Sequence, residues 1–267
     1  MIERYVGLDI GAETVKAVEL RRSGNVLRQA RRAIVEHHKE PASALLDLLS
    51  LWDWPDVTGA AVTGRFADLV SLDKVPTKHA LASGFRALEK GDAATIVSIG
   101  SHGFSVLELR ESGAEVFREN SRCSQGTGDF LRQLVARFDL DIEDASALCD
   151  PVEDPAPLSG RCPVILKTDM THLANKGESK ARILAGLYDA VCENVQVLIK
   201  PRVSPANVML AGGVSRSSRI RRHFARFFAR HEMTPIEAGE DDGLYLEALG
   251  SAIAAAGRDE ALPPPPL

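Results

Sequence analysis

The chain has 267 residues, of which 45% are hydrophobic and 26% charged. This composition is ordinary for a folded protein and excludes wholesale disorder, and the length suffices for two modest domains or one large one. With 32 Lys plus Arg against 37 Asp plus Glu, the net charge of -5 provides no general electrostatic basis for binding nucleic acid. The sequence shows neither a signal-peptide pattern nor an apolar run approaching the ~20 residues of a membrane helix. We therefore expect a cytoplasmic protein with no membrane partner.

The first residues predict a strand, a glycine turn and a second strand. Residues 5–10 form an apolar run that ends at Gly11, and apolar alternation resumes over residues 15–20, which is typical of a β-hairpin. A near-copy occupies residues 94–109, with Gly100 in its turn. Two such units in one chain indicate duplicated α/β halves. Further strands are expected at residues 25–36, 60–63 and 208–210, and helices at 42–51, from 129 onward, 142–148, 164–174, 181–199 and 243–256.

An arginine-rich segment near the C-terminal end is interleaved with apolar side chains at helical spacing. We interpret it as an amphipathic helix with a solvated basic face. A surface that contacts an acidic partner or a nucleotide is the alternative. The arginines are Arg216, Arg219, Arg221, Arg222, Arg226 and Arg230.

Three glycine turns are candidates for binding phosphate. A strand that ends in a glycine turn exposes backbone N–H groups to phosphate oxygens, and a nearby carboxylate can hold the accompanying Mg²⁺ through water. Gly11 follows Asp9, residues 126–128 open a helix, and residues 212–213 follow a strand. One such turn alone is more often plain turn chemistry. Three of them favour a nucleotide cleft between two halves.

Four motifs lie at residues 8–16, 98–100, 123–131 and 210–214, and the Cys-x-x-Gly-Thr-Gly-x-Phe-Leu stretch is the most specific of them. Together they resemble the 2-hydroxyacyl-CoA dehydratase activator family, which includes the ATPase subunits of benzoyl-CoA reductase (BadF/BadG/BcrA/BcrD-type ATPases). The family belongs to the superfamily of actin, sugar kinases and heat-shock chaperones. The resemblance therefore implies an α/β fold of two ribonuclease-H-like lobes with a nucleotide cleft between them. We expect a first lobe at residues 1–92 plus 242–260, a second lobe at 93–241, and a disordered Pro-rich tail at 261–267.

The resemblance also implies roles for single residues. Asp9 would hold hydrated Mg²⁺ at the first phosphate loop, and the pair Gly212 and Gly213 would lie against the adenosine. The nucleotide-binding residues implied are Gly11, Ala12, Glu13, Thr14 and Lys16 in the first loop, Gly100 and Ser101 in the second, and Gly126, Thr127, Gly128, Gly212 and Gly213 in the other lobe.

Two of the four cysteines are suited to an iron–sulfur cluster. Cys123 precedes a predicted helix and Cys162 is followed by Pro163, a favoured first helical residue. Both would lie near helix N-termini, where the dipole favours an anionic cluster; Cys149 and Cys192 lie on predicted helices. Since a four-iron cluster usually takes four thiolates, two per chain indicate one cluster shared across a dimer, as the resemblance also implies. The residues alone leave open that both are ordinary buried thiols.

The resemblance thus implies an ATP-hydrolysing activator with ATP, Mg²⁺ and one [4Fe-4S] cluster per homodimer. It would pass a low-potential electron to a 2-hydroxyacyl-CoA dehydratase or a related acyl-CoA reductase, and a ferredoxin or flavodoxin would be its own donor. The sequence leaves open which acyl-CoA is the substrate and whether the dimer contains identical chains.

The second phosphate loop departs from the family pattern, Asp-x-Gly-Gly-Gln-Asp. Residues 98–103 read Ser-Ile-Gly-Ser-His-Gly, so the carboxylates that would position magnesium or water are replaced. His102 is the candidate that remains for positioning the attacking water. ATP binding is therefore better supported than turnover. The alternatives are a degenerate nucleotide-binding subunit of a heteromeric complex, and a sugar-kinase-like phosphotransferase, which would need a catalytic aspartate that this loop lacks.

Overall fold

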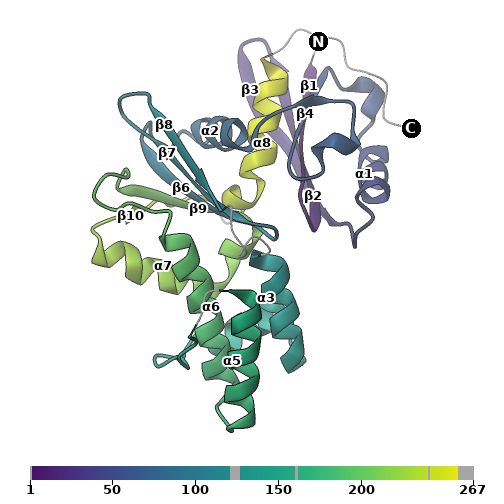
Figure 1. The fold of residues 1–267 in the computed structure, drawn as a ribbon. Coiled ribbons are helices and arrows are strands. Elements are labelled where there is room, and N and C mark those ends of the chain that lie inside the picture. The colour runs from purple at the N-terminus through teal and green to yellow at the C-terminus, as the bar shows by residue number, and fades with distance from the viewer. Residues whose placement is uncertain (1, 121–126, 160–161, 240, 258–267) are drawn as a thin grey trace. The chain divides into compact units, whose positions relative to one another are not determined.

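The computed structural model describes residues 2–120, 127–159, 162–239 and 241–257. The chain divides into two compact units, Met1–Asp92 with Ala238–Leu267, and Ala93–Glu237. Each unit contains one five-stranded sheet with helices (Figure 1). The predicted Pro-rich tail lies outside the described residues.

The sheet of the first unit is formed by β1 (Glu3–Ile10), β2 (Thr14–Ser23), β3 (Val26–Glu36), β4 (Gly59–Thr63) and β5 (Asp73–Lys74). The strand order is β3-β2-β1-β4-β5. β1 and β2 form the predicted antiparallel hairpin, and β1 also pairs in parallel with β4. β1 is thus the central strand, and its residues from Tyr5 to Ile10 are all buried.

Helices cover both faces of this first sheet. They are α1 (Pro41–Ser50), α2 (Thr77–Ala87) and α8 (Asp242–Ala256), with short 3-10 turns at η1 (Trp54–Asp56) and η2 (Ala67–Leu69). Side chains of α1 share a core with Val6, Leu8 and Ile10, and α8 packs on the opposite face. There, a Cβ at Gly7 would lie 2.0 Å from the carbonyl oxygen of Ala248, so glycine permits this close approach. Helix α2 was not predicted from the sequence.

The sheet of the second unit repeats this arrangement. Its strands are β6 (Ala94–Ile99), β7 (Phe104–Leu109), β8 (Glu115–Glu119), β9 (Asn207–Ala211) and β10 (Thr234–Pro235), in the order β10-β9-β6-β7-β8. A hairpin again leads, and its first strand pairs in parallel with a strand that comes later in the chain. The predicted α/β fold of two lobes is confirmed. The helices of this unit are α3 (Thr127–Val135), α4 (Ile142–Cys149), α5 (Pro163–Asn175), α6 (Lys180–Gln196) and α7 (Ser218–Arg230), with 3-10 turns η3 (Ala136–Phe138) and η4 (Gly213–Arg216).

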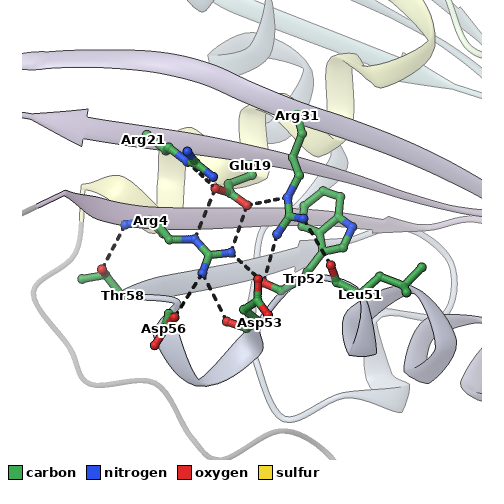
Figure 2. A network of polar contacts seen from close by, with 9 residues as sticks. All are labelled: Arg4, Glu19, Arg21, Arg31, Leu51, Trp52, Asp53, Asp56 and Thr58. Atoms are coloured by element: carbon green, nitrogen blue, oxygen red, sulfur yellow. Dashed lines mark hydrogen bonds and ion pairs between the residues drawn. The ribbon is translucent and has the colours of Figure 1, made fainter.

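A buried carboxylate ties the end of α1 to the first sheet (Figure 2). Glu19 is fully buried in β2 and accepts hydrogen bonds from Arg4, Arg21 and Arg31 at 2.7–3.2 Å. Two of these arginines, Arg4 and Arg31, also donate to the carbonyl oxygen of Trp52, just beyond α1. Burial by itself raises the pKa of Glu19, but the three arginines outweigh it and lower the pKa from 4.5 to about 2. Glu19 is therefore ionised at neutral pH.

The second unit contains the inverse arrangement, a buried arginine surrounded by oxygen atoms. Arg219 on α7 is only 2% exposed, and it donates to both carboxylate oxygens of Asp189 at 3.0 and 2.6 Å and to the carbonyl of Val152 at 2.5 Å. The predicted solvated face is therefore wrong at Arg219. The reason is that Asp189 on α6 supplies a half-buried counter-charge, a long-range pairing that helical periodicity does not reveal.

Candidate functional site

The first glycine turn joins β1 to β2 and carries a buried ion pair. The N–H of Gly11 donates to the carbonyl of Thr14 at 2.9 Å, which closes the turn. On either side of the turn, Asp9 and Lys16 are direct partners across the hairpin, and Lys16 Nζ lies 2.7 Å from Asp9 Oδ2. Asp9 is 7% exposed and Lys16 is 9% exposed. The hairpin thus places a carboxylate and an ammonium group together at one end of the sheet.

The two charges support each other. Burial lowers the pKa of Lys16, but the charge of Asp9 and its hydrogen bond outweigh this effect and raise the pKa above 10.5. Lys16 is therefore a cation at any physiological pH. Since Lys16 bonds to Oδ2, the other carboxylate oxygen of Asp9 is directed elsewhere. A Cβ at Gly64 would lie 2.6 Å from Oδ1, so Oδ1 faces the turn that follows β4.

That turn adds a residue which the sequence analysis missed. Thr63 ends β4 and is the direct partner of Asp9 in the parallel β1–β4 register. It is 1% exposed, and its hydroxyl has no hydrogen-bond partner among the described residues. The sequence carried a signal, a hydroxyl residue and glycine directly after a buried strand, but its proximity to Asp9 depends on the strand order.

The loop after β3 supports the first turn from another side. His37 Nε2 lies 3.2 Å from the carbonyl oxygen of Gly11, and the backbone N–H of Lys39 donates to His37 Nδ1 at 3.2 Å. Because Nδ1 accepts, the proton resides on Nε2, which donates to Gly11. Phe66 stacks edge-on against His37 at 6.0 Å, and its N–H donates to the carbonyl of Ile10 at 2.9 Å. The turn is therefore held by two later segments of the chain, one that follows β3 and one that follows β4.

Glu13 and Ala12 complete the first turn. Glu13 is 5% exposed and pairs with Lys39 at 2.5 Å. The residues predicted to form the first phosphate loop (Asp9, Gly11, Ala12, Glu13, Thr14 and Lys16) are thus consecutive parts of one braced hairpin end.

The second glycine turn has the same backbone and different side chains. The N–H of Gly100 donates to the carbonyl of Gly103 at 2.8 Å, as Gly11 does to Thr14 in the first unit. At the positions of Asp9 and Lys16 stand Ser98 and Ser105, which are direct partners across this hairpin. His102 is half-buried in the turn. This turn therefore offers backbone N–H groups and hydroxyls in place of an ion pair.

The start of α3 packs directly on the second turn. The N–H of Gly128 donates to the carbonyl of Gly100 at 3.2 Å, and that of Asp129 to the carbonyl of Ser101 at 2.9 Å. A Cβ at Gly128 would lie 2.8 Å from the Cα of Ser101. The structure thus brings Gly100, Ser101 and Gly128 together, with Thr127 buried beside them. Gly126, predicted with this group, lies outside the described residues.

The third predicted turn follows β9. Gly212 has φ of +84°, and a Cβ there would lie 2.4 Å from the carbonyl oxygen of Ile99. Only glycine fits this combination of conformation and approach. Gly213 begins η4, and Ser215 Oγ donates to the Gly212 carbonyl at 2.7 Å. This turn is therefore held against the end of β6, next to the second turn.

The three cysteines that the structure describes differ in accessibility. Burial raises the pKa of Cys149 to about 12 and raises that of Cys192 well above 9.0, so both are protonated thiols in the core. Cys162 is half-buried and is the N-cap residue of α5, with Pro163 in the first turn. Two exposed apolar side chains follow it, Val164 and Ile165. Cys123 lies outside the described residues.

The residues present fit the groups that the resemblance implies, to different extents. Asp9 Oδ1 and the unpartnered Thr63 hydroxyl suit the water shell of Mg²⁺, and Lys16 suits a phosphate. Cys162 lies at a helix N-terminus, which suits a thiolate ligand. Among the described residues, no group of three or more His, Cys, Asp or Glu side chains is placed to hold a metal ion.

Comparison with known proteins identifies the fold and the family. The chain has the two-lobed α/β architecture of the actin-like ATPase fold. The pattern that defines the BadF/BadG/BcrA/BcrD ATPase family matches residues 56–236, more than half of the chain, and the protein belongs to this family. Across the part of the chain that the structure describes, no helix is both long and apolar enough to cross a membrane.

Two characterised relatives match nearly their whole length. The 2-hydroxyisocaproyl-CoA dehydratase activator of Clostridioides difficile is 25% identical over 93% of this chain and 93% of its own. One of the subunits of the benzoyl-CoA reductase of Thauera aromatica is 24% identical over 96% of this chain and 94% of its own.

Two solved structures are similar. The activator of 2-hydroxyisocaproyl-CoA dehydratase from Clostridium difficile, with bound ADPNP, has a TM-score of 0.80, 25% identity and 94% coverage of each chain. Component A of the Acidaminococcus fermentans (R)-2-hydroxyglutaryl-CoA dehydratase has a TM-score of 0.79 at 21% identity, covering 96% of this chain and 98% of its own, and supports the fold alone.

Proposed function

We propose that this protein is an ATP-dependent activator that passes a low-potential electron to a 2-hydroxyacyl-CoA dehydratase or a related acyl-CoA reductase. A full-length similarity to a dehydratase activator and to a benzoyl-CoA reductase subunit supports this proposal. The observation that carries it is the contrast among the cysteines. Cys162 is half-buried at a helix N-terminus, whereas Cys149 and Cys192 are buried thiols.

Each hairpin turn has groups suited to part of a nucleotide. Lys16 would provide a positive charge for a phosphate, and Asp9 a carboxylate for the water shell of Mg²⁺. The turns at Gly100 and Gly212 would offer backbone N–H groups, and Gly128 would bring the start of α3 to the same place.

The cluster would be shared by two chains. Cys162 and Cys123, with the same pair from a second copy, would supply the four thiolates of a [4Fe-4S] cluster. Such a cluster supplies one-electron transfer, and a ferredoxin or flavodoxin would reload it. Val164 and Ile165, which are 72% and 47% exposed, would border it. In this scheme the protein is a cytoplasmic homodimer.

The test is anaerobic reconstitution with iron and sulfide, followed by metal analysis. We expect about four irons per dimer, together with a visible iron–sulfur absorption band. Cys162→Ser and Cys123→Ser should lose both. Cys149→Ser is the matched control, because Cys149 is a fully buried thiol of the core, unlike the half-buried Cys162, and it should keep the iron. Wild-type levels of iron in Cys162→Ser would contradict the proposal.

One observation favours a second candidate, a subunit that binds nucleotide without hydrolysing it. The second hairpin carries Ser98 and Ser105 where the first carries Asp9 and Lys16, so this turn has no carboxylate to position water or magnesium. Tight ADPNP binding together with the absence of phosphate release from ATP, with this protein reduced and an oxidised dehydratase partner present, would favour this candidate. His102→Ala tests the remaining water-positioning group, since it should lower any phosphate release that is observed.

A further inference from the structure

Three side chains form a row across the first sheet. Lys16 on β2, Asp9 on β1 and Thr63 on β4 are direct neighbours in the strand register. Paired residues point to the same face of a sheet, and residues two apart on a strand share that face. Asp9 is two residues from Gly7, which packs on α8. The row therefore lies on the α8 face, at the end of the strands where the glycine turn begins.

The Thr63 hydroxyl in this row makes no hydrogen bond to any residue that the structure describes. The residue is 1% exposed, and no described residue offers the hydroxyl a hydrogen bond. Leaving a buried hydroxyl unpaired costs about 1–3 kcal/mol, so a group outside the protein chain is expected to bond it. A buried threonine in the second unit shows the contrast, because Thr95 donates to the carbonyl of Pro205 at 2.8 Å.

The neighbours of the hydroxyl indicate what that group is. Asp9 accepts hydrogen bonds only, and its Oδ1 faces the turn after Thr63. A phosphate oxygen placed between Asp9 and Thr63 would be repelled by the carboxylate. A water molecule bound to a divalent cation can donate hydrogen bonds to both Asp9 Oδ1 and the Thr63 hydroxyl oxygen. The positive charge of the cation also attracts the carboxylate. On the other side of Asp9, Lys16 occupies Oδ2 and is available to a phosphate.

We infer that the Thr63 hydroxyl binds the water shell of the divalent cation that accompanies the nucleotide, as a second anchor beside Asp9. This inference rests on the proposed nucleotide binding and adds a residue to it. It also assigns the cation to the first unit, because the corresponding row of the second unit contains Ser105, Ser98 and Ala211, with alanine at the position of Thr63.

The experiment compares Thr63→Val, which removes the hydroxyl at nearly constant shape, with Thr63→Ser, which keeps it. ADPNP binding is measured on the full-length protein by calorimetry, once with MgCl₂ and once with EDTA. We expect Thr63→Val to weaken binding about tenfold with Mg²⁺ and to leave binding in EDTA unchanged. Thr63→Ser should stay within about threefold of the wild type in both. The matched control, Thr95→Val, should not change binding in either condition.

The melting temperature gives a second readout, which is expected to change in opposite directions in Thr63→Val and Thr95→Val. Without nucleotide, Thr63→Val should not lower the melting temperature and is expected to raise it, because an unpaired hydroxyl is removed. Thr95→Val should lower it, because a hydrogen bond is lost.

Three results would overturn the inference: equal Mg–ADPNP affinity in Thr63→Val and the wild type, equal weakening with and without Mg²⁺, or a melting temperature lowered as in Thr95→Val. A wild-type protein that does not bind ADPNP at all would instead overturn the proposed nucleotide binding itself.

Discussion

The two units have one topology and different polar chemistry at corresponding positions. In each, a hairpin closes through a glycine N–H, and a parallel strand ends beside it in a glycine of positive φ, Gly64 or Gly212. Both of these glycines press against the carbonyl of the residue that ends the central strand, Ile10 or Ile99. The backbone arrangement of these turns is therefore present in both units. The charged row, Lys16, Asp9 and Thr63, occurs in the first unit. Under the proposed function, the duplicated backbone turns would suit phosphate in both units, and the row of Lys16, Asp9 and Thr63 would restrict the cation to the first unit.

A second correspondence concerns a buried carboxylate in each hairpin. Glu19 lies eight residues after Gly11, and Glu108 lies eight residues after Gly100. Both carboxylates are fully buried in the second strand of their hairpin. Glu108 accepts from Arg110, Arg118 and Ser204 Oγ. Burial raises its pKa, but these donors outweigh burial, so the pKa is lowered from 4.5. The second unit has in addition the buried Arg219.

The largest loss of stability is expected from a substitution of Arg219. Arg219→Met leaves Asp189 with His223 as its remaining partner and removes the donor to the Val152 carbonyl, so the second unit should lose about 3–5 kcal/mol. Both tryptophans of the chain, Trp52 and Trp54, belong to the first unit. Hydrogen exchange should therefore rise in peptides of α6 and α7, while the tryptophan fluorescence transition in urea stays in place. Equal destabilisation of both units would contradict the comparison.

Glu19→Gln should destabilise the first unit by a smaller amount, about 2–3 kcal/mol, because its arginine partners are partly exposed. Here the tryptophan transition should move to lower urea. Since the folded pKa of Glu19 is about 2, the stabilisation is present above the unfolded value near 4.5 and is lost as pH falls towards 2. The difference between wild type and variant should therefore shrink on acidification. A difference that is constant from pH 7 to pH 3 would show that ionised Glu19 contributes nothing.

Lys16→Met tests the charged row through binding. Removing one charge-assisted hydrogen bond to a phosphate costs about 1.5–3 kcal/mol, which corresponds to about a tenfold to hundredfold loss of ADPNP affinity. Ser105→Ala changes the corresponding position of the second unit and should leave affinity within about twofold. Similar losses in the two variants, measured by calorimetry, would show that the rows are functionally equivalent.

The smallest effect is expected from the residue that braces the first turn. His37→Ala removes the donor to the Gly11 carbonyl, at a cost of about 1 kcal/mol. ADPNP affinity should fall about fivefold, because the turn is less well ordered before binding. The same variant should leave iron content per dimer unchanged. A loss of iron would indicate that the change reaches the second unit.

Local patterns in the sequence determined much of the fold. Apolar alternation around Gly11 and Gly100 predicted both hairpins, and residues 181–199 and 243–256 predicted α6 and α8 to within a few residues. These signals are local because side-chain periodicity and turn chemistry depend on neighbours in the chain. The motifs around the turns likewise sufficed to indicate the family, because each motif consists of consecutive residues.

Contacts between residues far apart in the chain could not be predicted from the sequence. Thr63 is an ordinary strand residue in the sequence, and it borders Asp9 because β4 inserts beside β1. Arg219 has the spacing of a surface arginine, and it is buried because α6 presents Asp189 to it. Strand order and helix packing are fixed by the burial of whole faces, which no local window of sequence contains. The backbone turns could therefore be predicted from the sequence. The polar residues that lie beside them, such as Thr63 beside Asp9, are determined by the packing of strands and helices.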